Sequence, residues 1–184
     1  MEIKDLYDNK WLSLKEISDK DKHIEGYVYA TETRCGGVII AIIPFRYNND
    51  QLEYLTIKGI TPAWSTNIAY YSSLTGGRDE NTSVLDQVIQ ELQEESGYIC
   101  EKEELIDLGA CNATKCMDTI YCLFAVDLSD KEHGKATTDG STTERMARAI
   151  WVKNISMSTD PILYTLFYKL VEYLKLKGKT KELL

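Results

Sequence analysis

The sequence predicts a mixed α/β protein. Short apolar or alternating segments of strand length recur along most of the chain, whereas two other segments carry apolar residues at helical spacing. No repeat, low-complexity tract or linker interrupts these segments. We therefore predict one domain over residues 1–184, with residues 1–24 as an N-terminal arm.

The first half of the chain predicts strands. Residues 1–24 are polar and charged around one apolar nucleus, WLSLKEI, and predict a leading strand or arm. Residues 38–45, VIIAIIPF, form a continuous apolar run that is typical of a strand buried on both faces. A turn over residues 47–50 joins this run to the next strand, so the two are predicted to form a hairpin. The remaining strands predicted in this half cover residues 26–33, 52–59 and 68–75.

The second half of the chain begins with a helix, predicted from Ser83 to Ser96. Thr82 or Ser83 is its expected N-cap and Gly97 its C-terminal stop. Its apolar stripe follows the i, i+3, i+4, i+7 pattern and consists of Leu85, Val88, Ile89 and Leu92. A long polar loop, residues 130–144, is expected to be mobile without ligand. Three further strands are predicted over 105–113, 119–128 and 147–155, and a closing amphipathic helix over 162–178.

The composition excludes several classes of partner. The formal net charge of −8 argues against the nucleic-acid backbone or an anionic membrane as the main partner. No apolar run approaches the ~20 residues of a membrane span, and the first residues lack the apolar region of a signal peptide, so we expect a cytoplasmic protein without membrane contact. Five cysteines occur without a CxxC pair, which favours reduced, packed thiols over a structural zinc site.

Three glutamates, Glu91, Glu94 and Glu95, lie one helical turn apart near the end of the first predicted helix. Like charges at this spacing repel one another, and they stand at the negative end of the helix dipole. A hard divalent cation compensates for both effects, since Mg²⁺ and Mn²⁺ take carboxylate oxygens as ligands. On spacing alone, the alternative of a solvated acidic helix face stays open.

The segment GGRDENTSVLDQVIQELQEESGY, residues 76–98, resembles the Nudix box, G-x5-E-x7-R-E-U-x-E-E-x-G-U, where U is a bulky apolar residue. The matching positions are Gly76, Glu91, Leu92, Glu94, Glu95, Gly97 and Tyr98. Thr82 replaces the first glutamate of the pattern and Gln90 replaces its arginine. In the family that arginine helps to hold the neighbouring catalytic glutamate, and Gln90 brings a hydrogen-bond donor without the charge.

The resemblance implies a Nudix fold, in which a mixed β-sheet is sandwiched between helices as an α/β/α sandwich. It also implies a metal-dependent pyrophosphohydrolase that cleaves the diphosphate linkage of a nucleoside diphosphate derivative with Mg²⁺ or Mn²⁺. Glu91 and Glu95 are the first-choice metal ligands, and Glu94 is a ligand or the base that activates water. A backbone carbonyl near Gly76 completes the metal shell. The bound cation would also explain how a protein with a net charge of −8 can bind a negatively charged polyphosphate.

A looser resemblance over residues 10–175 is to the ADP-ribose and ADP-sugar pyrophosphatase branch, which commonly forms homodimers through its N-terminal part. In that branch a glutamate of the late loop often serves as the base. Glu144 holds a comparable place here, with Glu132 or Asp139 as rivals and a solvated loop acid as the plain alternative. The proline that often marks the branch is missing from the region around Cys111.

Candidate substrate contacts also lie outside the helix. Trp64, Tyr70 and Tyr71 can stack a nucleobase, and Lys58, Arg78 and Arg34 can touch phosphate, although packing is the alternative for each of them. Three alternatives remain for the substrate and the function. The first is ADP-ribose or a related nucleotide sugar, and the second is a (d)NTP or a modified or capped nucleotide, for which a 5′ end would be the one nucleic-acid contact. The third is a sensor that binds a nucleotide sugar with little or no turnover, which the residues Thr82 and Gln90 keep open.

Overall fold

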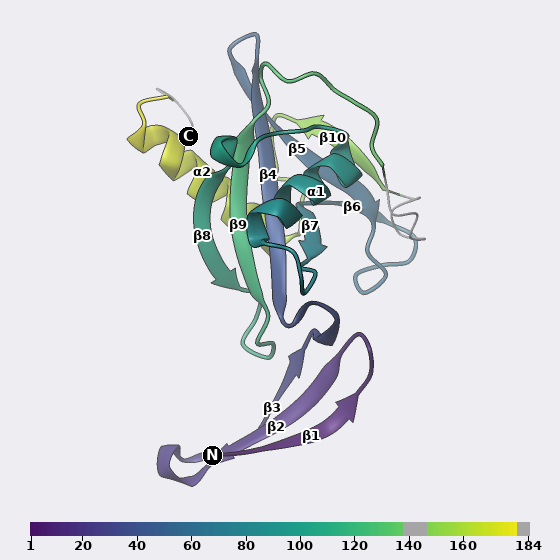
Figure 1. Cartoon of the computed structure of the whole chain (residues 1–184), viewed down its shortest axis with the longest axis vertical. Coiled ribbons are helices and arrows are strands. Elements are labelled where there is room, and N and C mark those ends of the chain that lie inside the picture. The colour runs from purple at the N-terminus through teal and green to yellow at the C-terminus, as the bar shows by residue number, and fades with distance from the viewer. Residues whose placement is uncertain (138–146, 180–184) are drawn as a thin grey trace.

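A mixed seven-stranded sheet forms the centre of the molecule, and a smaller three-stranded sheet projects from one end of it (Figure 1). The computed structural model describes residues 1–137 and 147–179. Neither helix in these ranges is long and apolar enough to cross a membrane. The strands are β1 Glu2–Asp8, β2 Ser13–Asp19, β3 Ile24–Thr31, β4 Val38–Asn48, β5 Gln51–Ile60, β6 Ala69–Ser72, β7 Leu74–Gly77, β8 Ile106–Asn112, β9 Ile120–Asp127 and β10 Arg148–Val152. The helices are α1 Val84–Ser96 and α2 Pro161–Leu176, with single 3-10 turns η1 Lys20–Lys22, η2 Thr33–Cys35 and η3 Lys102–Glu104.

The central sheet has the strand order β10-β5-β4-β9-β8, and the short strands β6 and β7 pair with β5 and β4. β4 and β9 are parallel, whereas the other pairs of this sheet in the described residues are antiparallel. The end of β4 pairs with β5, as Phe45 opposite Tyr54 shows, and its beginning pairs with β7, where Ile40 stands opposite Gly76. The predicted hairpin of β4 and β5 is confirmed. β4 also pairs with β7, in which the segment 76–98 with the three glutamates begins.

The two faces of the central sheet are covered by different helices, α1 in front and α2 behind in Figure 1. Along β4, Ile40 and Ile42 pack in the core beneath α1, while Ala41, Ile43 and Phe45 pack in the core beneath α2. All five are 0–1% exposed, so the continuous apolar run is buried on both faces as predicted. The predicted α/β/α sandwich is confirmed.

The predicted strand over residues 68–75 is wrong in one respect, because it consists of two strands, β6 and β7, that pair with different neighbours. The break falls at Ser73, whose backbone N–H and hydroxyl both lie 2.9 Å from Oδ2 of Asp160 and donate to it. Asp160 also caps α2 by accepting from the N–H of Ile162 at 2.8 Å. This buried carboxylate satisfies the N–H that leaves the ladder and ties α2 to the start of β7.

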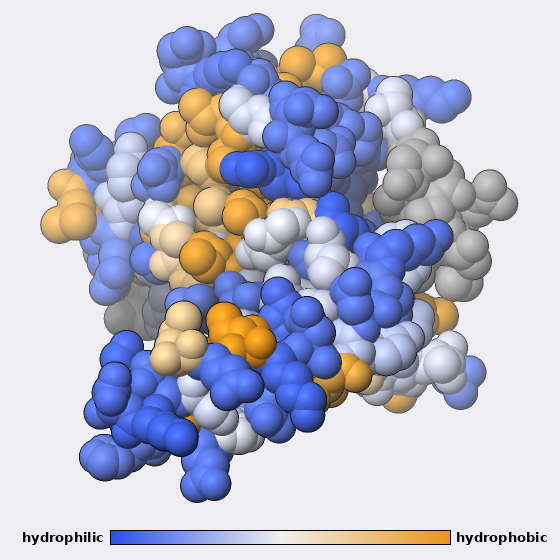
Figure 2. Space-filling view, turned by 60° about the horizontal axis from the view of Figure 1, so that its bottom comes forward, coloured by the Kyte–Doolittle hydropathy of each residue, from blue (hydrophilic) through white to orange (hydrophobic). Residues whose placement is uncertain are grey.

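The N-terminal arm is the antiparallel sheet β1-β2-β3, so it continues to Thr31, beyond the predicted boundary at residue 24. It joins the central domain through a short parallel contact. In the backbone, the N–H of Ala30 donates to the carbonyl of Cys116 at 2.8 Å, and the N–H of Asp118 donates to the carbonyl of Ala30 at 3.1 Å. A side-chain bond adds to them, since Thr31 Oγ1 donates to Asp118 Oδ2 at 2.7 Å. Every residue of β1 is exposed. Figure 2, in which this end comes forward, shows hydrophobic groups among mostly hydrophilic ones.

The limits of both predicted helices are confirmed to within two residues, whereas Leu85 of the predicted apolar stripe is exposed. Ser83 caps α1, with its hydroxyl accepting from the N–H of Asp86 at 3.2 Å. Gly97 ends α1 in the left-handed conformation at φ 76°, and its N–H donates to the carbonyl of Gln93 at 2.9 Å. The buried stripe of α1 contains Val88 and Leu92, and this orientation turns the glutamates toward the end of β7.

Candidate active site

Gly76 and Glu91 are in direct contact. Gly76 lies on β7, which β4 holds beside α1, and Glu91 lies on the third turn of α1. An ideal β-carbon at residue 76 would stand 2.5 Å from Glu91 Oε2 and nearer still to Oε1 and Cδ of that side chain. A β-carbon at position 76 would therefore displace the carboxylate of Glu91, whereas glycine leaves it in place.

A polar cavity of about 450 Å³ opens beside this contact, between β7, the end of η2 and the outer face of α1. Of the predicted metal ligands it contains Gly76, Glu91 and Glu94. Glu95 lies one turn after Glu91 on the same helix, is half-buried, and is not among the lining residues. The lining consists of Arg34, Cys35, Thr75, Gly76, Gly77, Asp79, Gln87, Gln90, Glu91 and Glu94.

Two glutamine side chains hold the two lining glutamates. Gln87 Nε2 donates to Glu91 Oε1 at 3.1 Å, and Gln90 Nε2 donates to Glu94 Oε1 at 2.9 Å. Both pairs have i, i+4 spacing on α1, where side chains on successive turns meet. The role of Gln87 was missed in the sequence, although its spacing to Glu91 is the same as the spacing of Gln90 to Glu94.

The opposite wall of the cavity comes from the turn that precedes β4. Arg34 lies there as the cationic side chain of the lining, with Nε 3.5 Å from Glu32 Oε2. Cys35 is 4% exposed, and burial followed by the charge of Glu32 raises the pKa of its thiol. Its sulfur is therefore uncharged at neutral pH, which makes it a poor metal ligand or nucleophile. A β-carbon at Gly77 would lie 3.0 Å from Cys35 Cβ, so this second glycine lets the two segments approach.

The donor set of the cavity suits a hard divalent cation. Glu91 and Glu94 supply two carboxylates, and the backbone at Gly76 lies against the first of them. Mg²⁺ is commonly held by one or two carboxylates together with substrate phosphate, so two are enough. No group of three or more acidic, cysteine or histidine side chains stands close enough to share an ion within residues 1–137 and 147–179.

The predicted substrate contacts other than Arg34 lie away from this cavity. Lys58 Nζ stands 5.0 Å from the ring centre of Tyr71 on the neighbouring strand, and Trp64 packs edge-on against Tyr70 at 5.6 Å. The Nε of Arg78 is buried without a hydrogen-bond partner among the described residues. Arg78 lies between the lining residues Gly77 and Asp79 in the chain but does not itself line the cavity.

Two of the predicted bases, Glu144 and Asp139, lie outside the described residues, as do residues 138–144 of the predicted mobile loop. The third, Glu132, is exposed. The described start of the loop packs on the end of α1, where the N–H of Gly134 donates to the carbonyl of Gly97 at 3.1 Å. This contact brings the loop to the end of the helix that carries the glutamates.

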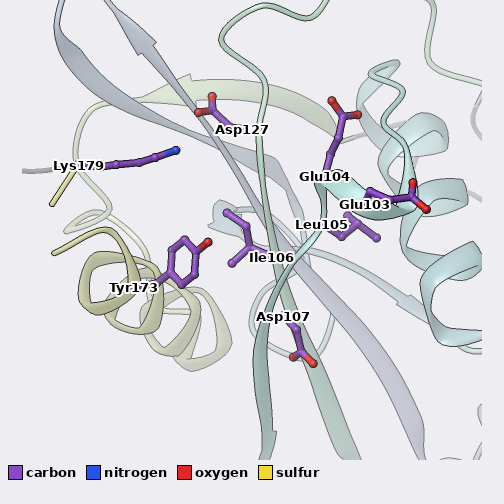
Figure 3. A pocket seen from close by; sticks show the side chains of 8 residues that line it. All are labelled: Glu103, Glu104, Leu105, Ile106, Asp107, Asp127, Tyr173 and Lys179. Atoms are coloured by element: carbon purple, nitrogen blue, oxygen red, sulfur yellow. The ribbon is translucent and has the colours of Figure 1, made fainter. Parts of the chain in front are cut away.

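A second cavity of about 450 Å³ lies between α2, β8 and η3 (Figure 3). It also contains four carboxylates, of which Glu103 is exposed and the other three have local partners. Glu104 accepts from Lys131 Nζ at 2.6 Å, Asp127 from the hydroxyl of Ser129 at 2.6 Å, and Asp107 from the N–H of Gly109 at 2.7 Å. These side chains maintain turns at the edge of the sheet, so the cavity beside Gly76 is the better candidate.

Solved structures share this architecture over most of the chain. A crystal structure of an ADP compounds hydrolase covers 98% of this chain and 95% of its own, with a TM-score of 0.68 and 13% identity. This protein has the Nudix fold. A Nudix hydrolase structure from Listeria monocytogenes covers 79% of this chain and 99% of its own, with a TM-score of 0.57 and 17% identity. The Nudix domain of Shewanella oneidensis NrtR, in complex with ADP ribose, covers 74% and 87% with a TM-score of 0.57 and 14% identity.

Sequence comparison adds nothing to this Nudix assignment, because no family model matches the chain and no curated protein matches it. The predicted Nudix resemblance is confirmed at the level of the fold. Within that fold, the segment 76–98 forms the strand, loop and helix on which the cavity stands.

Proposed function

We propose that the protein hydrolyses the diphosphate linkage of a nucleoside diphosphate derivative, with ADP-ribose or a related nucleotide sugar as the substrate and Mg²⁺ or Mn²⁺ as the cofactor. The observation that carries this proposal is the arrangement of Glu91 and Glu94 around one cavity with Gly76 and Arg34. Two similar structures, an ADP compounds hydrolase and a Nudix domain with bound ADP ribose, support the choice of substrate class.

Each residue of the cavity has a role in this reaction. Glu91 and Glu94 would hold the cation, and Gly76 leaves the room that Glu91 needs. When bound, the divalent cation neutralises the diphosphate and lowers the pKa of a water molecule. Arg34 is half-exposed at the opposite wall and donates to a phosphate oxygen, which its planar guanidinium suits. Glu95 remains a proposed further ligand, and Glu144 a proposed base.

We also propose that the protein forms a homodimer through the N-terminal arm. A three-stranded sheet needs a hydrophobic face covered to be stable, and the arm has none covered by the described part of its own chain. Ile3, Ile17 and Tyr27 stand opposite one another across the three strands and form one apolar row, of which Ile3 is 49% and Tyr27 46% exposed. A second copy of the chain covers this row if the two arms pack together.

Incubation with a panel of nucleotides and Mg²⁺ or Mn²⁺, followed by mass spectrometry, tests the reaction. AMP and ribose phosphate from ADP-ribose are the expected products. A nucleoside monophosphate and pyrophosphate from a (d)NTP or a modified nucleotide would move the protein to the second substrate class. Intact nucleotides under all conditions would contradict hydrolysis.

A nucleotide-sugar sensor is the second candidate, because two observations favour it. Gln90 provides a neutral amide to Glu94 instead of a cation. In addition, three acidic side chains do not converge on one point in the described residues. Binding of ADP-ribose in a calorimeter without product formation would support this candidate over the enzyme.

A further inference from the structure

Gln87 joins the loop before α1 to Glu91. Its side chain is buried, with 2% exposed, in the first half of the helix. The amide oxygen accepts from the backbone N–H of Asp79 at 3.2 Å, and the amide nitrogen donates to Glu91 Oε1 at 3.1 Å. One polar side chain therefore bridges a loop and a carboxylate of the cavity.

The orientation of this amide follows from its two partners. A backbone N–H can only donate and an ionised carboxylate can only accept. The reversed amide would place its NH₂ group against the N–H of Asp79 and its oxygen against Glu91, and both contacts would be repulsive. Gln87 is thereby held with its donor toward Glu91, and this donor fixes the torsion of the carboxylate that faces Gly76.

We propose that Gln87 is a positioning residue that orients Glu91 for a divalent cation, an inference that rests on the proposed function. A neutral amide suits this task because it donates a hydrogen bond without adding positive charge beside the cation. Gln90 binds Glu94 in the same way, so the two glutamines divide the two carboxylates between them. Groups that orient metal ligands in this manner typically contribute a factor of about 10–100 to metal affinity or activity.

A purely structural role for Gln87 makes a different prediction. In that case the bond to Asp79 would stabilise the loop, and its loss would lower the melting temperature without changing the affinity for a cation. Binding of Mn²⁺ alone, measured on the full-length protein by the electron paramagnetic resonance of free Mn²⁺, separates the two roles.

The test variant is Gln87→Met, which keeps the length of the side chain and removes both hydrogen bonds. The control is Gln93→Met, the same change on the same helix at a position outside the cavity lining. We expect Gln87→Met to bind Mn²⁺ on the order of 10-fold more weakly and to lower kcat by about 10–100-fold with a smaller change in KM. Gln93→Met should match the wild type in all three quantities.

Equal Mn²⁺ affinity of Gln87→Met and the wild type would overturn the positioning role and leave the proposed function intact. If the wild type itself binds no Mn²⁺ alone, the positioning role fails, whereas the proposed function fails only when the nucleotides of the panel also stay intact.

A measurement on the wild type does not depend on the folding of any variant. The side-chain NH₂ protons of Gln87 should exchange with solvent much more slowly than those of Gln93, because they are buried and bonded to a carboxylate. Equally fast exchange of the two side chains would show that the bond to Glu91 is not maintained in solution, and the proposal would be abandoned.

Discussion

The carboxylate of Glu91 occupies the space in which a β-carbon of residue 76 would stand. The contact joins β7 to the middle of α1, and it explains what glycine provides at a strand position without special backbone angles. It also makes the position of Glu91 sensitive to a single methyl group on another element.

Gly76→Ala should therefore reduce activity while leaving the fold intact. The methyl group displaces the end of a flexible side chain, and a shift of a catalytic group by about 1 Å can lower the rate by about 100-fold. Steady-state kinetics at saturating Mg²⁺ and thermal unfolding of the apo protein provide the measurements. In a Glu91→Asp background, where the carboxylate is withdrawn by one methylene, the added methyl group should have a smaller effect. Equal effects in both backgrounds would argue against a direct clash.

The carboxylates should be needed for turnover and unimportant for stability. Glu91→Gln and Glu94→Gln each remove a charge from the proposed cation site and should lower kcat/KM by orders of magnitude. The apo proteins should be as stable as the wild type or slightly more stable, since like-charge repulsion on α1 is relieved. Kinetics with Mg²⁺ and with Mn²⁺, together with urea unfolding in the presence of a chelator, check both statements. Wild-type rates in both variants would rule out this cavity as the catalytic site.

Gln90→Arg should be tolerated and should keep or raise activity. Gln90 is exposed on α1 and already donates to Glu94 Oε1 at 2.9 Å, so an arginine can make the same bond with a charge. The gain in apo stability expected from an i, i+4 ion pair is about 0.2–0.5 kcal/mol. The kcat/KM ratio of variant and wild type is the measurement, and a large loss would mean that a neutral amide is required at this position.

The stability of the protein should fall in acid through Glu53, which is 7% exposed. Hydrogen bonds from Arg46, at 2.8 Å from Nε and 2.7 Å from Nη2, hold the pKa of Glu53 below its ordinary value of 4.5. The folded protein thus favours the ionised form, and this stabilisation is complete above pH 4.5 and is lost as the pH falls below it. Glu53→Gln should reduce the free energy of unfolding at pH 7 by about 1–3 kcal/mol and flatten its decline in acid.

Urea unfolding between neutral pH and acid measures this dependence. The exposed Glu172 of α2 supplies the control, since Glu172→Gln should change the free energy of unfolding by less than about 0.5 kcal/mol. An acid profile of Glu53→Gln that is parallel to the wild type would contradict the assignment.

The arm should control the oligomeric state. Ile3→Ser removes an exposed apolar side chain from the row that we propose as the dimer contact, and Lys4→Ser makes a change on the other face of the same strand. Analytical ultracentrifugation should show weaker dimers for Ile3→Ser and unchanged dimers for Lys4→Ser. A wild-type protein that stays monomeric at micromolar concentration would remove the dimer proposal.

The sequence was sufficient for the parts of the structure that depend on local pattern. The buried run of β4 and the limits of α1 were predicted because continuous apolar runs, caps and helical spacing are encoded in neighbouring residues. The break at Ser73 was missed because its cause, Asp160, lies far away in the chain. Within the site, the motif supplied Glu91 and Glu94, whereas the contacts of Gln87 and Cys35 with the cavity depend on how the turn before β4 and the loop before α1 meet α1 in space.

The parallel pairing of β4 with β9 has a consequence for how the protein folds. Residues 38–45 pair with residues 120–127, and Gly76, Gln87, Glu91 and Glu94 all lie in the chain between these two segments. Val88 and Leu92 of α1 pack in the same core as Phe124 and Val126 of β9. A fragment that stops before β9 contains the whole motif but lacks Phe124 and Val126 of the core in which its helix packs. Because loops of this length close slowly, we expect the geometry of the candidate site to form late and in one step with the completed sheet.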